Sequence, residues 1–95
     1  SPHGNVTLRR FGLRPKESEL YIEIPIYEVD YQGDVELFRN NLSSRAFSLF
    51  QVIEKEPSWV SYLQENGIHQ VTILLETPWD PQRQQIHSFP LEAAS

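Results

Sequence analysis

The clearest pattern in the chain is an alternation of hydrophobic and polar positions between Leu20 and Tyr31. Up to Ile26 every second residue is hydrophobic, which is the period of a β-strand with one buried face. The phase then shifts by one residue, because the next hydrophobic positions are Tyr27 and Val29. A β-bulge inserts one residue and produces such a shift. The pattern therefore predicts a long, bulged strand over residues 20–31.

Pro25 indicates where this strand lies in its sheet. Proline has no N–H group to donate to a neighbouring strand, so it favours an edge strand, a bulge, or a position whose amide side faces solvent. A long apolar edge strand is also a template for pairing with another chain. We therefore expect an interaction surface along this strand, extended by a tryptophan from a later turn. The expected interaction residues are Tyr21, Glu23, Pro25, Tyr27, Val29, Tyr31 and Trp79.

Weaker strand patterns flank this segment and predict two hairpins. Residues 6–13 form the first candidate strand, and the turn at residues 14–18 joins it to the strand that begins at Leu20. Residues 68–76 alternate again, and the proline-containing turn at residues 77–81 leads to a weaker strand over residues 83–89.

The middle of the chain has the spacing of helices. Asp34 is a good N-cap, and hydrophobic residues recur every three or four positions as far as Ile53. The polar run at residues 40–44 is poor helix material, which leaves open one long helix or two shorter segments. Pro57 suits the first turn of a further short helix that ends at Asn66-Gly67.

These elements predict one α+β domain over residues 1–95, with an antiparallel sheet of two hairpins, N-terminal and C-terminal, and a central helical region packed on one face. We expect residues 1–4, which lack a methionine, to be partly a cloning remnant, and residues 91–95 to be a frayed tail. The expected core is Leu20, Ile22, Ile24, Ile26, Phe38, Leu42, Phe47, Leu49, Phe50, Ile53, Trp59, Leu63, Val71, Ile73 and Leu75.

Composition narrows the choice of compartment and chemistry. The chain has no cysteine, which removes disulfides, thiolate nucleophiles and cysteine-based zinc sites. It also has no signal-peptide pattern and no apolar run of membrane-spanning length, so we expect a soluble cytoplasmic protein with no membrane partner. The net charge of −5 argues against nucleic acid as a partner.

Charge is unevenly distributed along the chain. Four basic residues lie between Arg9 and Lys16, and seven acidic residues follow with no basic residue between them. The basic segment, which contains Phe11, has two interpretations. It is a small nucleic-acid patch, or it pairs internally with the acidic strand beside it through opposite charges that face each other across the ladder.

Candidate catalytic groups are sparse. No serine lies in a nucleophile-elbow motif, and the four glycines stand alone rather than in a phosphate-binding loop. His69 and His87 would be cross-strand neighbours in the second hairpin, and with Glu76 or Asp80 they make a weaker hypothesis of a metal site. We therefore predict no catalytic, cofactor-binding or metal-binding residues.

The sequence favours a non-enzymatic protein-interaction or assembly module that binds a protein partner or itself, self-associating through the predicted edge strand. One alternative is an acidic inhibitor or regulator that occupies a basic, nucleic-acid-binding surface of a partner protein. A second is a ligand-binding or catalytic domain completed by a partner subunit. Trp79, in a turn between two prolines, either folds over the edge of the core or is exposed as an interface anchor.

Overall fold

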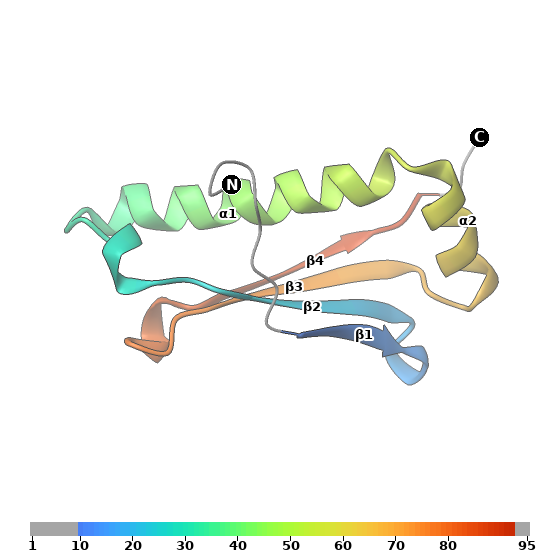
Figure 1. The fold of residues 1–95 in the computed structure, drawn as a ribbon, viewed down its shortest axis with the longest axis horizontal. Coiled ribbons are helices and arrows are strands. Elements are labelled where there is room, and N and C mark those ends of the chain that lie inside the picture. Colours follow the sequence, from blue (N-terminus) through green and yellow to red (C-terminus); the bar gives the residue numbers. More distant parts are fainter. Residues whose placement is uncertain (1–9, 93–95) are drawn as a thin grey trace.

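The computed structural model describes residues 10–92, in which two helices cover one face of a four-stranded sheet (Figure 1). The expectations for residues 1–9 and 93–95 lie outside the described residues. The strands are β1 (Arg10–Arg14), β2 (Glu19–Pro25), β3 (Gln70–Glu76) and β4 (Gln85–Pro90). The helices are α1 (Val35–Glu54) and α2 (Pro57–Glu65), and three 3₁₀ turns complete the set: η1 (Pro15–Glu17), η2 (Glu28–Asp30) and η3 (Pro81–Arg83).

The strand order is β1-β2-β3-β4, and the sheet is mixed. Both predicted hairpins are confirmed, because β1–β2 and β3–β4 are antiparallel pairs. The prediction of a purely antiparallel sheet is wrong, since β2 and β3 run parallel. The physical reason is the helical crossover, which returns the chain to the end of the sheet from which β2 started.

β2 lies inside the sheet, so the prediction of an edge strand is wrong. It pairs with β1 on one side and with β3 on the other. Pro25 is tolerated because it is the last residue of the strand, and the next N–H group, that of Ile26, donates to the Glu76 carbonyl oxygen at 2.8 Å. The predicted bulge is also absent: the phase shift after Ile26 marks the end of the strand and the start of the segment that contains η2.

The helix signals in the sequence are confirmed. Asp34 Oδ1 accepts a hydrogen bond from the Leu37 N–H at 3.0 Å, which is N-cap geometry. α1 is one continuous helix through the polar run, because Leu42 and Ala46 are buried against the sheet and hold that run in place. α2 begins at Pro57, and Gly67 adopts a φ of +78° that ends the helical region.

The core fills the space between the helices and the sheet, and most of its predicted members are buried. Phe47 and Trp59 are exceptions, with 48% and 50% of their surfaces exposed, because the apolar stripes of α1 and α2 turn Phe50, Val60 and Leu63 inward instead. Leu20 and Leu49 are partly buried. Leu91 was expected in a frayed tail, but it is buried and its N–H donates to the His69 carbonyl oxygen at 2.8 Å.

α1 packs mainly on β3 and β4, and the helix-facing residues Ile22 and Ile24 of β2 are also buried in the core. β1 lies farthest from α1 (Figure 1). The register places Phe11 opposite Ile22 and Leu13 opposite Leu20, so both side chains point to the helix-bearing face. Within residues 10–92 both stay outside the buried core, with Phe11 66% and Leu13 39% exposed.

Candidate functional site

The sheet face without helices carries a set of charged cross-strand pairs. The β1–β2 register puts Arg10 opposite Glu23 and Arg14 opposite Glu19. Arg10 Nε donates to Glu23 Oε2 at 3.1 Å, and Arg14 Nη1 lies 3.8 Å from Glu19 Oε2. The arginines at these two positions therefore pair internally with the acidic strand, as one of the two interpretations of the basic segment predicted.

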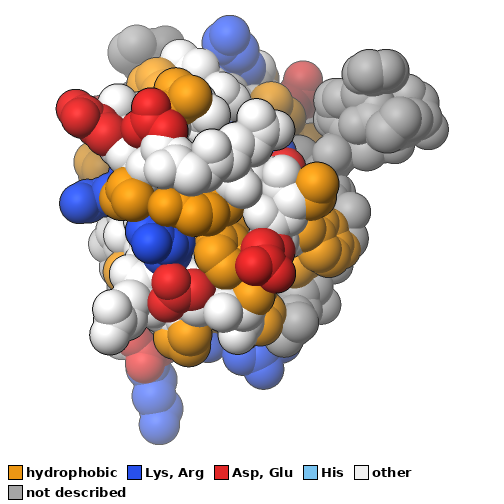
Figure 2. All heavy atoms as spheres, turned by 90° about the vertical axis from the view of Figure 1, so that its left-hand side faces the viewer, with side chains coloured by type: hydrophobic (Ala, Val, Ile, Leu, Met, Phe, Trp, Pro, Cys, Tyr) orange, Lys and Arg blue, Asp and Glu red, His pale blue; other side chains and the backbone are white. Residues whose placement is uncertain are grey.

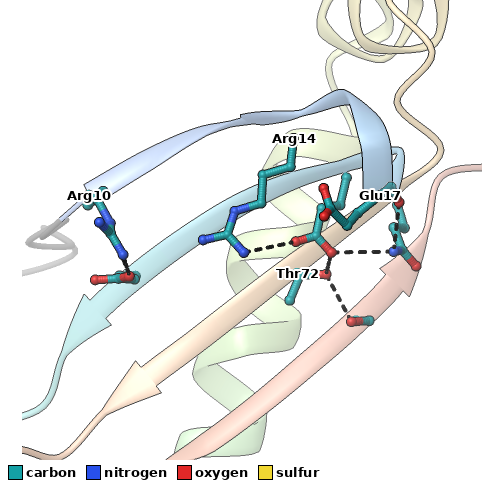
Figure 3. A network of polar contacts seen from close by, with 8 residues as sticks. Arg10, Arg14, Glu17 and Thr72 are labelled. Atoms are coloured by element: carbon teal, nitrogen blue, oxygen red, sulfur yellow. Dashed lines mark hydrogen bonds and ion pairs between the residues drawn. The ribbon is translucent and has the colours of Figure 1, made fainter.

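Glu19 connects this charge pair to the rest of the sheet (Figure 3). Thr72 Oγ1 donates to Glu19 Oε1 at 3.1 Å, and the Thr72 and Ser88 hydroxyls lie 2.9 Å apart. Gln70 Nε2 lies within 3.5 Å of the same Glu19 oxygen. Because a carboxylate that is only 8% exposed is costly without partners, this arrangement stabilises the sheet and ties all four strands together.

Tyr21 occupies the centre of this face. The Arg14 guanidinium carbon lies 3.6 Å from the centroid of its ring, a cation–π contact. Burial raises the pKa of the Tyr21 phenol, and its hydrogen bond with Glu23 raises it further. The same Glu23 carboxylate raises the pKa of Arg10, first through their hydrogen bond and then through its charge.

The structure divides the predicted interaction residues between two places. Tyr21 and Glu23 are 9% and 6% exposed and belong to the face just described, so little of either is accessible to a partner. Pro25 is half-buried at the end of β2. The other four lie on the segments that follow β2 and β3, at the end of the molecule where η2, η3 and the start of α1 meet (Figures 1 and 2). They are Tyr27, Val29, Tyr31 and Trp79, which together we call the end patch.

Two members of the end patch, Tyr31 and Trp79, form an aromatic cluster with Phe38 of α1. The Trp79 ring stacks on Tyr31 with a centroid separation of 6.0 Å and meets Phe38 edge-on at 5.8 Å. Trp79 Nε1 donates to the Ile26 carbonyl oxygen at 2.8 Å. The tryptophan therefore folds over the edge of the core, which decides between the two predicted positions. Arg83 covers the outer side of Tyr31, with its guanidinium carbon 4.5 Å from the ring centroid.

The other two members of the end patch have side chains exposed to solvent. Val29 is 79% exposed and Tyr27 is 57% exposed. Figure 2 views this end directly and shows hydrophobic side chains gathered over it, with acidic and basic side chains among them. Exposed hydrophobic side chains on a rigid base are typical of protein-binding surfaces.

The charge around the end patch is predominantly acidic. Glu28 and Asp30 flank Val29 in η2, and Asp34 and Glu36 lie at the start of α1. Among the described residues, Arg45 forms an ion pair with Asp30, at 3.8 Å. Glu28, Asp34 and Glu36 have no ion pair among these residues, so the end patch carries an excess of negative charge at its rim.

The predicted histidine pair does not form. The β3–β4 register places His87 opposite Ile73, whereas His69 precedes β3 beyond the other end of that ladder. His87 Nε2 instead lies 2.7 Å from Gln85 Oε1. Within residues 10–92 no three histidine, cysteine, aspartate or glutamate side chains converge on a point that suits a metal ion.

A shallow groove of about 710 Å³ separates α1 from β4. Two hydrogen bonds join α1 to β4 in this groove. The Ser43 hydroxyl donates to Gln85 Oε1 at 3.2 Å, and Gln85 Nε2 donates to the Arg39 carbonyl oxygen at 3.2 Å. These contacts stabilise the packing of α1 on β4. Ser43 Oγ and His87 Nε2 both bond to the same Gln85 oxygen, and among the described residues no hydrogen bond joins this hydroxyl to this imidazole.

Comparisons with known proteins identify no relative of this chain. No protein-family model matches it, and neither the curated proteins nor the solved structures contain a match. Within the described part of the chain, neither helix combines the length and the apolar composition needed to cross a bilayer.

Proposed function

We propose that this chain is a non-enzymatic protein-interaction domain that docks a basic protein surface through the end patch. The observation that carries the proposal is the pair of exposed side chains, Tyr27 and Val29, on a segment whose base, Tyr31, is anchored by ring contacts to Phe38 and Trp79. Such a base limits the conformational entropy that binding removes, because the contact residues are already in place.

The acidic rim supports a basic partner. Glu28, Asp34 and Glu36 surround the hydrophobic contacts and would attract lysine and arginine side chains on the partner. A second copy of this chain docking patch to patch would bring these like charges together, which disfavours self-association at this end.

The same rim favours one second candidate, an acidic regulator that occupies the nucleic-acid-binding surface of a basic protein. Both candidates predict binding that weakens as salt is added. A competition experiment distinguishes the two candidates. Nucleic acid should displace the chain from its partner if the chain is a regulator that occupies the nucleic-acid-binding surface, and should not displace it if the chain docks elsewhere on the partner.

Capture experiments with matched variants test the proposal. The wild-type chain, Val29→Lys and the control Val52→Lys are immobilised, and the proteins that each retains from a cell extract are compared. Val52 is exposed on the last turns of α1, at the opposite end of that helix. We expect a partner that the wild type and Val52→Lys retain, that Val29→Lys loses, and that purified in isolation binds the wild type with the same salt dependence. Equal retention of all proteins by the three baits would contradict docking at the end patch.

A further inference from the structure

The edges of the sheet differ in how well they are protected. β4 is tied to α1 at its first residue, Gln85, by hydrogen bonds with Ser43 and Arg39, and it ends at Pro90, which has no N–H group to offer a neighbour. β1 pairs with β2 on one side, and within residues 10–92 no strand lies on its other side. Among the described residues, β1 is therefore an edge strand with no such contact to a helix or proline, and the one that lies farther from α1 (Figure 1).

The sequence of β1 is nearly symmetric about its centre. It reads Arg10-Phe11-Gly12-Leu13-Arg14, with an arginine at each end, a large hydrophobic residue on each side of the centre, and glycine in the middle. A two-fold axis through Gly12, perpendicular to the sheet, would pair two copies of β1 antiparallel. In that register Phe11 of each copy faces Leu13 of the other, so the interface is self-complementary, as two-fold symmetry requires.

We propose that β1 forms an antiparallel pair with the β1 strand of a second copy of this chain, centred on Gly12. This association is independent of the end patch. It joins two four-stranded sheets into one continuous sheet, with the helices of both copies on the same face. Phe11 and Leu13 of the two copies then form a hydrophobic strip in the gap that α1 leaves uncovered.

The charged side chains of β1 do not prevent a second strand from pairing with it. Charged side chains on an edge strand ordinarily discourage pairing. Here Arg10 and Arg14 reach across to the carboxylates of β2, as Figure 3 shows, and Arg14 also lies over the Tyr21 ring. In this register Arg10 of one copy would face Arg14 of the other copy. Glu23 and Glu19 already balance these two charges within each sheet.

The small area of the proposed contact indicates a weak association. Five residues per copy bury on the order of several hundred Å², which is at the low end of specific interfaces, below roughly 1,200 Å². Phe11, 66% exposed, and Leu13, 39% exposed, supply the hydrophobic part. The structure therefore predicts a weak dimer that dissociates on dilution, not a permanent one.

Sedimentation equilibrium over a concentration series measures the association. We expect the wild-type mass to rise from monomer to dimer with concentration, and Phe11→Lys to raise the dimer dissociation constant at least tenfold. Val29→Lys should leave that constant unchanged, which separates this proposal from docking at the end patch. A wild-type mass that stays monomeric up to about 1 mM overturns the proposal, since that exceeds the Kd range of weak but specific contacts.

Cysteine cross-linking tests the register, since the chain contains no cysteine of its own. Residues that face each other across an antiparallel pair have Cα atoms roughly 4.5–5.5 Å apart, which suits a disulfide. A Cβ added at Gly12 meets no atom within 4 Å, so Gly12→Cys should fold normally. We expect Gly12→Cys to form a disulfide-linked dimer on mild oxidation.

A mixture of two variants sharpens this test. Phe11→Cys with Leu13→Cys should form a mixed dimer, whereas each alone should cross-link slowly because its two cysteines lie diagonally, about 7–8 Å apart. Ser88→Cys, exposed on β4, is the control for random collision. Cross-linking of Gly12→Cys no faster than Ser88→Cys, or a mixture in which Phe11→Cys and Leu13→Cys each cross-link with themselves faster than with each other, overturns the proposed register.

Discussion

Trp79 Nε1 donates a hydrogen bond to the main-chain carbonyl oxygen of Ile26, and the two atoms are 2.8 Å apart. This bond joins the turn after β3 to the residue that follows β2, at the edge where the two parallel strands end. It also fixes the ring that supports Tyr31, so the shape of the end patch depends on it.

The two tryptophans should therefore differ in their effect on stability. We expect Trp79→Ala to lower the free energy of unfolding by about 2–4 kcal/mol, because it removes the stacking on Tyr31, the contact with Phe38 and the hydrogen bond. Trp59→Ala should cost less than about 1 kcal/mol, since half of that side chain is already in solvent. Urea unfolding followed by circular dichroism measures both changes.

Trp79→Phe separates the ring from the hydrogen bond. It keeps an aromatic ring and loses the N–H donor, so we expect a cost of roughly 1 kcal/mol. Equal destabilisation by Trp79→Ala and Trp59→Ala would show that the aromatic cluster contributes little.

Thr72→Val tests the polar face of the sheet. The substitution keeps the shape of the side chain but removes the hydroxyl that donates to Glu19 and contacts Ser88. Because Glu19 is buried, we expect a loss of about 1–3 kcal/mol in the free energy of unfolding. Ser88→Ala is the control: its residue is exposed, so its loss should be smaller. A neutral Thr72→Val variant would mean that Gln70 and Arg14 alone satisfy the carboxylate.

The raised pKa of Tyr21 predicts a loss of stability in alkali. In the unfolded chain the phenol ionises near the ordinary value of 10.0, whereas in the folded chain it holds its proton to higher pH. Above about pH 10 the folded state therefore binds more protons than the unfolded state, and the free energy of unfolding decreases as pH rises. Below that value this group has no effect on the pH dependence.

Urea unfolding of the wild type and Tyr21→Phe between about pH 8 and 11 measures this effect. We expect the free energy of unfolding of the wild type to decrease more steeply with pH above about pH 10, since phenylalanine has no proton to lose. Parallel pH profiles for the two proteins would indicate that ionisation of Tyr21 is not coupled to folding.

Local features of the sequence were enough to predict the helical regions and the approximate positions of the four strands, but not where β2 ends. The N-cap at Asp34, the helix start at Pro57 and the positive φ of Gly67 each depend on residues within one turn of the chain. The β1–β2 hairpin and its opposite charges were also predictable, because its strands are adjacent in sequence and one short turn joins them. The interaction role of Tyr27, Val29, Tyr31 and Trp79 stays a prediction, and the sequence did not indicate that these four residues lie at one end of the molecule.

The position of each element in the sheet depended on tertiary structure. The alternation up to Ile26 identified one buried face of β2, but it contained no information about which strands lie on either side. A helical crossover places β3 beside β2, so β2 is an interior strand, and β1 and β4 are the edge strands of the sheet that residues 10–92 form. The same limit applies to Trp59 and Trp79, because hydrophobicity does not specify whether a neighbouring element covers a side chain. Sequence periodicity records which residues share a face, whereas burial is set by contacts between segments distant along the chain.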